Sequence, residues 1–123
     1  MDKAFVGERQ IGAGASPYFV AELGTCHEGS LEIALQLTRA AAEAGADCVK
    51  TETFQRENMV FDPEMTFTYE IRGERITERL VDHMDRCQLS FDEHERIKQE
   101  CDRLGLHFMS TVHDFAAVDF LRE

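Results

Sequence analysis

The spacing of apolar residues along the chain changes repeatedly between the period of a strand and that of an amphipathic helix. Residues 5–12, with the glycine-rich segment after them, predict a short hairpin that leads into an apolar strand at 18–21. Ser30 is a typical N-cap residue, and the helix that it opens is predicted to end at Gly45. The apolar face of this helix consists of Leu31, Ala34, Leu35, Thr38 and Ala41 or Ala42.

The same unit then recurs. A short strand is predicted at 48–51, and the helix-ending glycine before it is the turn chemistry expected in a parallel α/β fold. The segment 55–89 is a long connection that contains Pro63 and Gly73, and an amphipathic stretch at 76–86 predicts a helix within it. Connections of this length are more often functional than accidental.

A third unit completes the pattern. The sequence SFDE at 90–93 is a capping box that opens a helix, and Gly105 is predicted to end it. The inner face of this helix is predicted to hold Ile97, Cys101 and Leu104. A strand at 106–111 follows, and a last helix starts near Asp114. The residues predicted to share one side of that last helix are Phe115, Val118 and Leu121.

Strands that alternate with helices favour parallel pairing and right-handed crossovers, so the chain is predicted to be an α/β protein. Catalytic groups in such folds gather at the C-terminal ends of the strands. The polar residues at those ends are Glu22, Lys50, Glu52, Thr111, His113 and Asp114. Three strands cannot close a (β/α)8 barrel of about 250 residues. We therefore expect residues 1–123 to be the N-terminal portion of a larger barrel, whose remainder this chain lacks.

The composition excludes several classes of partner. Of the 123 residues, 43% are apolar, which is enough to form the core of about one domain. The 24 acidic and 13 basic residues give a net charge of -11, which disfavours nucleic acid and anionic membrane surfaces as partners. The sequence has neither an apolar run of about 18 residues nor the apolar segment of a signal peptide, so a cytoplasmic location is predicted.

The four cysteines form no CxxC pair and match no zinc-binding spacing, which predicts free thiols. Cys48, Cys87 and Cys101 stand among apolar positions and are expected in the core, where a thiol behaves as a small hydrophobic group. Cys26 differs from the other three, because it lies in a polar loop directly before His27.

Three segments have distinctive sequences: FVGERQIGAGASPYFVAELGTCHEG at 5–29, GADCVKTETF at 45–54 and LSFDEHERIKQECDRLGLHFMSTVHD at 89–114. The first resembles a hairpin of the form FxIGxRxIGxGxP leading into AEIGxNHxG. The second is similar to GADxVKFQTF, and the third to LSxEEFxxLxxYxxxxGIxFxSTPFD. These motifs belong to the sialic acid synthase family, the N-acetylneuraminate synthases and their legionaminic and pseudaminic acid counterparts. Because all three occur in order and at matching spacing, the chain is identified as resembling this family.

The resemblance implies a TIM barrel, often followed by a small antifreeze-protein-like domain. It also implies a transferase that condenses phosphoenolpyruvate with an N-acyl-mannosamine-type amino sugar to a nonulosonic acid and releases phosphate. In this family a divalent metal, manganese or magnesium, polarises the sugar aldehyde, and its histidine ligands lie in the later half of the barrel. We therefore expect a homo-oligomeric enzyme of which this chain alone is inactive and lacks a complete metal site.

The resemblance also implies roles for single residues. Glu22 is similar to the glutamate of the first barrel strand, which sits near the sugar. Lys50 resembles the lysine that meets phosphoenolpyruvate, and Thr111 the threonine at its phosphate, with Ser110 as the alternative hydroxyl. His27 matches the histidine of NHxG, where it either contacts the ligand or shapes the loop. The chemistry is consistent with these roles, because an anionic substrate needs a cation and hydroxyl donors.

The departures from the family pattern are Cys26, Thr51, Glu52, Val112 and His113, where the family has Asn, Phe, Gln, Pro and Phe. Glu52 has the largest consequence, because a carboxylate in place of an amide repels an anionic substrate unless a metal or Lys50 intervenes. It is either a substrate contact or the ion-pair partner of Lys50. His113 and Asp114 are candidate metal ligands, but the position of Asp114 at the start of a helix favours a role as its N-cap.

Two alternatives to a phosphoenolpyruvate-dependent synthase stay open at this point. The first is another aldolase-like or sugar-processing enzyme on the same scaffold, which the departures at Glu52 and Cys26 permit. The second is a non-catalytic half-barrel that associates with itself or with a second chain, because its exposed strand edges would otherwise favour aggregation.

Overall fold

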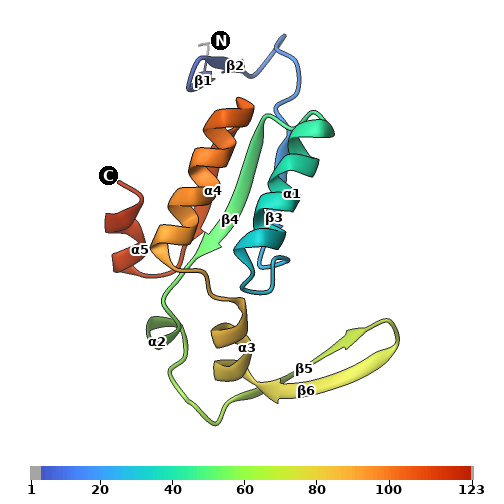
Figure 1. Ribbon diagram of the computed structural model, residues 1–123, viewed down its shortest axis with the longest axis vertical. Coiled ribbons are helices and arrows are strands. Elements are labelled where there is room, and N and C mark those ends of the chain that lie inside the picture. The colour runs from blue at the N-terminus through green and yellow to red at the C-terminus, as the bar shows by residue number, and fades with distance from the viewer. Residues whose placement is uncertain (1–3, 123) are drawn as a thin grey trace.

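The computed structural model describes residues 4–122, and its centre is a parallel sheet of three strands. The strands are β3 (Val20–Gly24), β4 (Cys48–Thr53) and β7 (His107–Val112), with β4 in the middle. Figure 1 shows α1 (Leu31–Glu43) and α4 (Phe91–Leu104) side by side over one face of this sheet. The parallel pairing and the alternation with helices confirm the predicted α/β class.

The remaining elements are shorter or lie outside this central layer. They are β1 (Ala4–Val6), β2 (Arg9–Ile11), α2 (Arg56–Met59), β5 (Thr66–Ile71), β6 (Glu74–Arg79), α3 (Leu80–Cys87) and α5 (Phe115–Phe120). β1 and β2 form the predicted N-terminal hairpin, and a second hairpin of β5 and β6 extends from the opposite end of the molecule (Figure 1). None of the helices within residues 4–122 is long and apolar enough to cross a membrane.

The core lies between the sheet and the two helices that cover it. Its buried members are Leu23, Ala34, Ala41, Val49, Leu89, Ile97, Cys101 and Leu106. The predicted burial of Cys48, Cys87 and Cys101 is confirmed, and Cys26 is exposed. All four are free thiols, as the absence of a pairing pattern predicted.

Both predicted ends of α4 are confirmed. The hydroxyl oxygen of Ser90 accepts from the backbone N–H of Glu93 at 3.3 Å, and the Glu93 carboxylate accepts from the N–H of Ser90 at 2.8 Å. These two bonds are the capping box, which satisfies two backbone donors at the start of the helix. Gly105 ends the helix with φ of +73°, a conformation that glycine adopts without steric cost.

Glu100 of α4 links this helix to α1 and gives a prediction for acid stability. Its carboxylate accepts from Arg103 and from Arg39 of α1, and these bonds lower the pKa of Glu100 from 4.5 to about 2. A carboxyl group whose folded-state pKa is depressed stabilises the fold above its unfolded-state pKa, and this stabilisation is lost as pH falls toward the folded-state value. Urea unfolding between about pH 5 and about pH 2 should therefore show a smaller loss of stability in Glu100→Gln than in the parent protein. Equal pH dependence of the two proteins would contradict the prediction.

The long connection differs from its prediction as a helix at 76–86. The segment folds first as β6, which pairs with β5, and becomes helical only at Leu80, where α3 begins. Ile71 and Glu74 are paired across the hairpin, so the turn has two residues, and Arg72 and Gly73 both have positive φ. This is the backbone combination of the tight hairpin turns whose twist suits antiparallel strands.

The three residues predicted to share one side of α5 differ in burial. Val118 and Leu121 are partly buried, whereas the Phe115 residue is 90% exposed. The buried residue of this helix is Ala117. A short helix of six residues that packs through one small side chain leaves its larger neighbours outside the contact.

The strand boundaries differ slightly from the prediction. The strand expected at 18–21 begins at Val20 and runs to Gly24, and the strand expected at 48–51 runs to Thr53. The third strand lies at 107–112 in place of 106–111. The longer ends bring Glu22 and Glu52 inside the strands, where the ladder hydrogen bonds hold their backbones.

Candidate functional site

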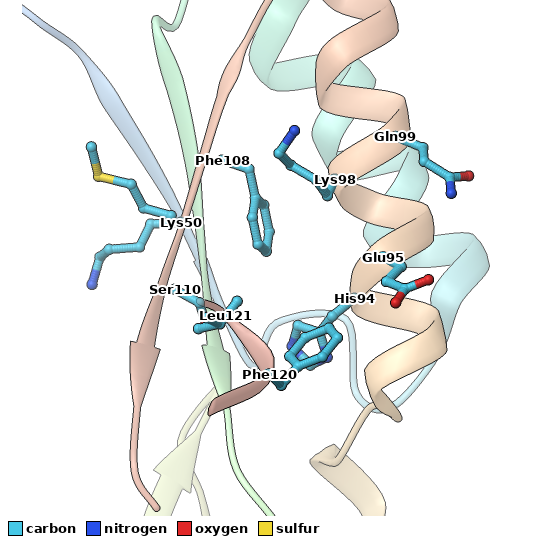
Figure 2. Close-up of a pocket in the computed structure, with 10 residues that line it drawn as sticks. Lys50, His94, Glu95, Lys98, Gln99, Phe108, Ser110, Phe120 and Leu121 are labelled. Carbon is cyan, nitrogen blue, oxygen red and sulfur yellow. The ribbon is translucent and has the colours of Figure 1, made fainter. Parts of the chain in front are cut away.

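The candidate site lies where the three parallel strands end, on the face that α1 and α4 leave uncovered. Successive strand residues point to opposite faces of a sheet. In β4, Val49, Thr51 and Thr53 are buried toward the helices, whereas Lys50 and Glu52 are partly exposed on the other face. Figure 2 shows this directly for Lys50, which points away from α4 while Phe108 of β7 points toward it.

Lys50 is the centre of this site. The strand register places it opposite Glu22 of β3, and its ammonium forms an ion pair with the Glu22 carboxylate. The same ammonium donates to the hydroxyl oxygen of Thr111 on β7 at 3.1 Å. The other carboxylate oxygen of Glu22 accepts from the backbone N–H of Gly24 at 3.0 Å, which fixes its direction. Three neighbouring strands thus bring the predicted cation, carboxylate and hydroxyl together.

The arrangement is accessible to a ligand. The side chain of Lys50 is 33% exposed, and that of Glu22 is 48% exposed. An ammonium on a partly exposed side chain, with an adjacent hydroxyl, can bind an anionic oxygen by charge-assisted hydrogen bonds. The carboxylate beside it can accept a proton or a hydrogen bond from a second reactant.

Glu52 has a different partner from the one considered in the sequence. Lys50 pairs with Glu22, whereas a carboxylate oxygen of Glu52 lies 3.4 Å from the Nε2 atom of His113. The interpretation of Glu52 as the ion-pair partner of Lys50 is therefore wrong. Glu52 lies opposite Thr111 in the ladder, so it remains at the edge of the same site.

Ser110, the alternative hydroxyl, lies away from this site. Its hydroxyl is 2.6 Å from the hydroxyl of Thr53 and accepts from that of Thr51 at 3.2 Å, and both threonines are fully buried toward the helices. The structure does not bring Ser110 together with Lys50, because adjacent residues of β7 point to opposite faces of the sheet. Thr111 is the hydroxyl that the fold presents to Lys50.

His27 lies in the loop between β3 and α1 and is only 1% exposed. Its Nδ1 atom accepts from the backbone N–H of Gly29 at 3.1 Å, and within residues 4–122 its Nε2 atom has no hydrogen-bond partner. Burial, with a smaller contribution from His94, lowers the pKa of His27, which favours the neutral imidazole. Of the two predicted roles, this placement supports shaping the loop over contacting a ligand.

The same loop contacts α3 closely at Gly29. Gly29 has φ of +74°, and a Cβ atom at this position would collide with the backbone carbonyl oxygen of Arg86. The loop that follows Glu22 is therefore held by a backbone contact that only glycine permits. The sequence HEG at 27–29 places a glycine in this loop, but it does not indicate which residue the glycine contacts.

The predicted N-cap role of Asp114 is confirmed. One of its carboxylate oxygens accepts from the backbone N–H of Ala117, and the other from that of Gln55, both at 2.7 Å. Burial raises the pKa of Asp114, but these backbone donors outweigh it and leave the pKa below its ordinary value. The carboxylate thus joins the start of α5 to Gln55, the residue before α2.

The side chains that the structure describes do not by themselves form a donor set that fits a bound metal. Within residues 4–122 no group of three or more His, Cys, Asp or Glu side chains is gathered closely enough to hold a metal ion. The candidate ligand Asp114 already satisfies two backbone donors, and His113 faces Glu52. We therefore assign no chemical step to a metal held by these residues.

His94 of α4 is a buried residue near the site. It is 1% exposed, and its Nε2 atom lies 3.2 Å from the backbone carbonyl oxygen of Glu52. Its Nδ1 atom lies 3.0 Å from the carbonyl oxygen of Ser90. His94 thus packs α4 against the end of β4, and its spacing of three from the buried Ile97 was the available signal.

One groove lies on the face of the sheet opposite to the Lys50 ammonium. It has a volume of about 660 Å³ and lies along the free edge of β7, between α4 and α5. Its apolar lining includes Phe108, Phe120 and Leu121 (Figure 2). Lys50 is one of its lining residues, but the Lys50 ammonium points to the other face of the sheet.

Curated relatives resemble most of this chain. The sequence model of the NeuB family matches residues 37–123. The N,N'-diacetyllegionaminic acid synthase of Legionella pneumophila is 30% identical over 115 residues, which is 94% of this chain and 32% of that protein. Human N-acetylneuraminate-9-phosphate synthase is 27% identical over 121 residues, which is also 94% of this chain and 32% of that protein. The chain spans about a third of the length of these relatives.

Solved structures resemble the fold. An N-acetylneuraminic acid synthetase from Leptospira borgpetersenii has a TM-score of 0.80 at 20% identity, over 98% of this chain and 38% of that one. The spore coat polysaccharide biosynthesis protein SpsE of Bacillus subtilis has a TM-score of 0.69 at 27% identity, over 98% of this chain and 30% of its own. These likenesses confirm the expected partial TIM barrel, in which β3, β4 and β7 are consecutive barrel strands.

Proposed function

Because the chain belongs to the NeuB family, we propose that the complete enzyme condenses phosphoenolpyruvate with an N-acyl-mannosamine-type sugar to form a nonulosonic acid. The observation that carries the proposal is the placement of the Lys50 ammonium between Glu22 and Thr111, at the ends of three consecutive strands. An anion that approaches this ammonium also meets the Thr111 hydroxyl.

The three residues have separate roles in this proposal. Lys50 and Thr111 bind the anionic oxygens of phosphoenolpyruvate through charge-assisted hydrogen bonds. When the Lys50 ammonium binds phosphoenolpyruvate, Glu22 is released from its ion pair with Lys50 and faces the amino sugar. A carbon–carbon bond forms between the methylene carbon of phosphoenolpyruvate and the aldehyde carbon of the sugar, whose oxygen takes up a proton and becomes a hydroxyl. A water molecule adds to the carbon that bears the phosphate ester, and the bond from that carbon to the ester oxygen then breaks, so that phosphate leaves and a keto acid remains. The strand register supports these roles, because residues fixed on three paired strands can bind two reactants in one orientation and so remove part of the entropic barrier.

A calorimetric titration of phosphoenolpyruvate into the intact protein tests the Lys50 assignment. Lys50→Ala should weaken binding by about 10-fold to 100-fold, which corresponds to the loss of one hydrogen bond to a charged group. Lys98→Ala is the matched control, because Lys98 is also a partly exposed lysine and pairs with Asp102 of the same helix, α4. It should leave the affinity unchanged.

Two outcomes would contradict the proposal. One is a folded parent protein that gives no heat with phosphoenolpyruvate. The other is equal affinity of the Lys50→Ala variant and the parent, which would place the anion site elsewhere.

A divalent metal, manganese or magnesium, remains a prediction for the complete enzyme. Since residues 4–122 hold no cluster of three or more suitable donors, its ligands would come from other parts of the barrel. A homo-oligomeric state and a cytoplasmic location also remain predictions.

A further inference from the structure

We propose that the outer edge of β5 is a docking surface for a second copy of this chain. The two β5 strands pair in antiparallel fashion about a two-fold axis at Thr68, so that two hairpins form one sheet of four strands. The inference goes beyond the proposed function and does not depend on it. It gives a role to the β5–β6 hairpin, which takes no part in the proposed condensation.

The outer edge of β5 has unpaired backbone groups. The hairpin projects away from the central sheet (Figure 1), and within residues 4–122 the strand that pairs with β5 is β6 alone. The carbonyl oxygen of Met65 accepts from the backbone N–H of Leu80 at 2.8 Å, so the odd-numbered residues of β5 turn their backbone groups toward β6. The N–H and C=O groups of Thr66, Thr68 and Glu70 therefore face outward.

The helix α3 covers a face of the hairpin and leaves this edge accessible. Its residue His83 lies 2.9 Å from the Glu78 carboxylate of β6, and the ring of His83 meets that of Phe67 edge to face at 5.0 Å. Phe67 and Glu78 are opposite each other in the hairpin, so both point to the face that α3 covers. Thr66, Thr68 and Glu70, with their outward backbone groups, are exposed. An exposed, unpaired strand edge is a template for pairing with another chain.

The apolar residues of β5 are complementary to themselves about Thr68. An antiparallel pairing centred on Thr68 sets residues at equal distances before and after it opposite each other. Met65 and Ile71, which are 53% and 50% exposed, then contact each other across the two copies. Phe67 of one copy faces Tyr69 of the other, and cross-strand aromatic pairs stabilise a sheet. Exposed apolar side chains at both ends of the strand thus become covered.

The charges at the ends of β5 match in the same pairing. Glu64 lies four residues before Thr68, and Arg72 lies four residues after it. The pairing therefore brings the Glu64 carboxylate of each copy to the Arg72 guanidinium of the other. Glu70 meets the uncharged Thr66, so no two like charges are opposite each other between positions 64 and 72.

The outer edge of β6 lacks this complementarity. Its outward-facing backbone positions are those opposite Thr66, Thr68 and Glu70, namely Arg79, Thr77 and Arg75. A two-fold pairing about Thr77 would set Arg75 of one copy against Arg79 of the other. Like charges directly opposite each other destabilise a pair of strands, so the second copy docks on β5 and not on β6.

Disulfide cross-linking of the intact protein tests the pairing, in a Cys26→Ser background that removes the exposed native thiol. In the proposed register the two Thr68 residues are a hydrogen-bonded pair with Cα atoms about 5.5 Å apart, which suits a disulfide. With oxidised glutathione as the oxidant, Thr68→Cys should give a covalent dimer on a non-reducing gel. Thr77→Cys is the matched control, because the Thr68 and Thr77 hydroxyls are 2.8 Å apart and either variant loses the same hydrogen bond. It should remain monomeric on the gel.

A charge exchange in the Thr68→Cys protein tests the register. Arg72→Glu sets two carboxylates opposite each other at both ends of the paired strands, and should slow formation of the covalent dimer by about tenfold. Adding Glu64→Arg to this variant restores opposite charges and should restore the rate.

Thermal unfolding identifies the variants that are folded. If Thr68→Cys does not fold, Thr66→Cys combined with Glu70→Cys replaces it, because these positions face each other across the two copies. A folded cysteine variant that forms no covalent dimer, or forms it no faster than Thr77→Cys, would overturn the inference. Failure of Glu64→Arg to reverse the effect of Arg72→Glu would overturn it as well. None of these outcomes bears on the binding of phosphoenolpyruvate, so the proposed function is tested separately.

Discussion

Replacing Gly29 by alanine should lower the free energy of unfolding by about 2–5 kcal/mol. Two costs add at this position. The residue has φ of +74°, which costs an L-amino acid about 1–2 kcal/mol, and the new methyl group collides with the carbonyl oxygen of Arg86. Because that obstacle is backbone, it cannot rotate away as a flexible side chain would. Relief requires a shift of α3 or of the loop, with a cost of about 1–3 kcal/mol.

Gly45→Ala separates the two costs. Gly45 has φ of +85°, but nothing lies within 4 Å of the Cβ atom that alanine would add. The control should therefore lose only the conformational part, about 1–2 kcal/mol. Urea unfolding of both variants measures the difference. If Gly29→Ala and Gly45→Ala lose the same stability, the close contact between the loop and α3 is not present in solution.

The alternation of strands and helices was predictable, because the ends of helices are determined by residues close to them in the sequence. The helix start at Ser90 and the helix stop at Gly105 depend on neighbouring residues alone, and both lie where expected. The segment 76–86 was misread because an amphipathic pattern resembles a helix in a short window. Its first residues are held in β6 by pairing with β5, and no property of β6 alone indicates that pairing.

The candidate site was predictable in its position and only partly in its contacts. Glu22, Lys50 and Thr111 stand at strand ends, and parallel strands place such residues together. The choice between Thr111 and Ser110 depended on which face of β7 each occupies. A shift of one residue in the strand register would have exchanged them, and the sequence does not fix the register to one residue.

The partner of Glu52 illustrates the same limit of sequence reasoning. Glu52 stands two residues after Lys50, so both side chains point to one face, and an ion pair between them was a reasonable interpretation. The structure instead joins each of them to a neighbouring strand, Lys50 to β3 and Glu52 to the end of β7. Pairs across strands are closer than residues two apart within one strand.

Glu22→Gln should have opposite effects on substrate binding and on turnover in the complete enzyme. In the free protein the Glu22 carboxylate is paired with the Lys50 ammonium, so phosphoenolpyruvate must displace the carboxylate to bind the ammonium. A neutral amide competes less well for the ammonium, and the affinity for phosphoenolpyruvate should rise by about threefold or more. The amide oxygen can still accept from the N–H of Gly24, so the loop keeps its shape.

Turnover should fall by about 100-fold or more in the same variant, because an amide cannot take up a proton on the sugar side of the site. Steady-state kinetics with phosphoenolpyruvate and the amino sugar measures both effects, and Glu32→Gln, an exposed glutamate in the first turn of α1, serves as the matched control. Unchanged turnover in Glu22→Gln would remove Glu22 from the chemistry. A parallel loss of affinity and of thermal stability would show that its carboxylate holds the fold and does not act on the substrate.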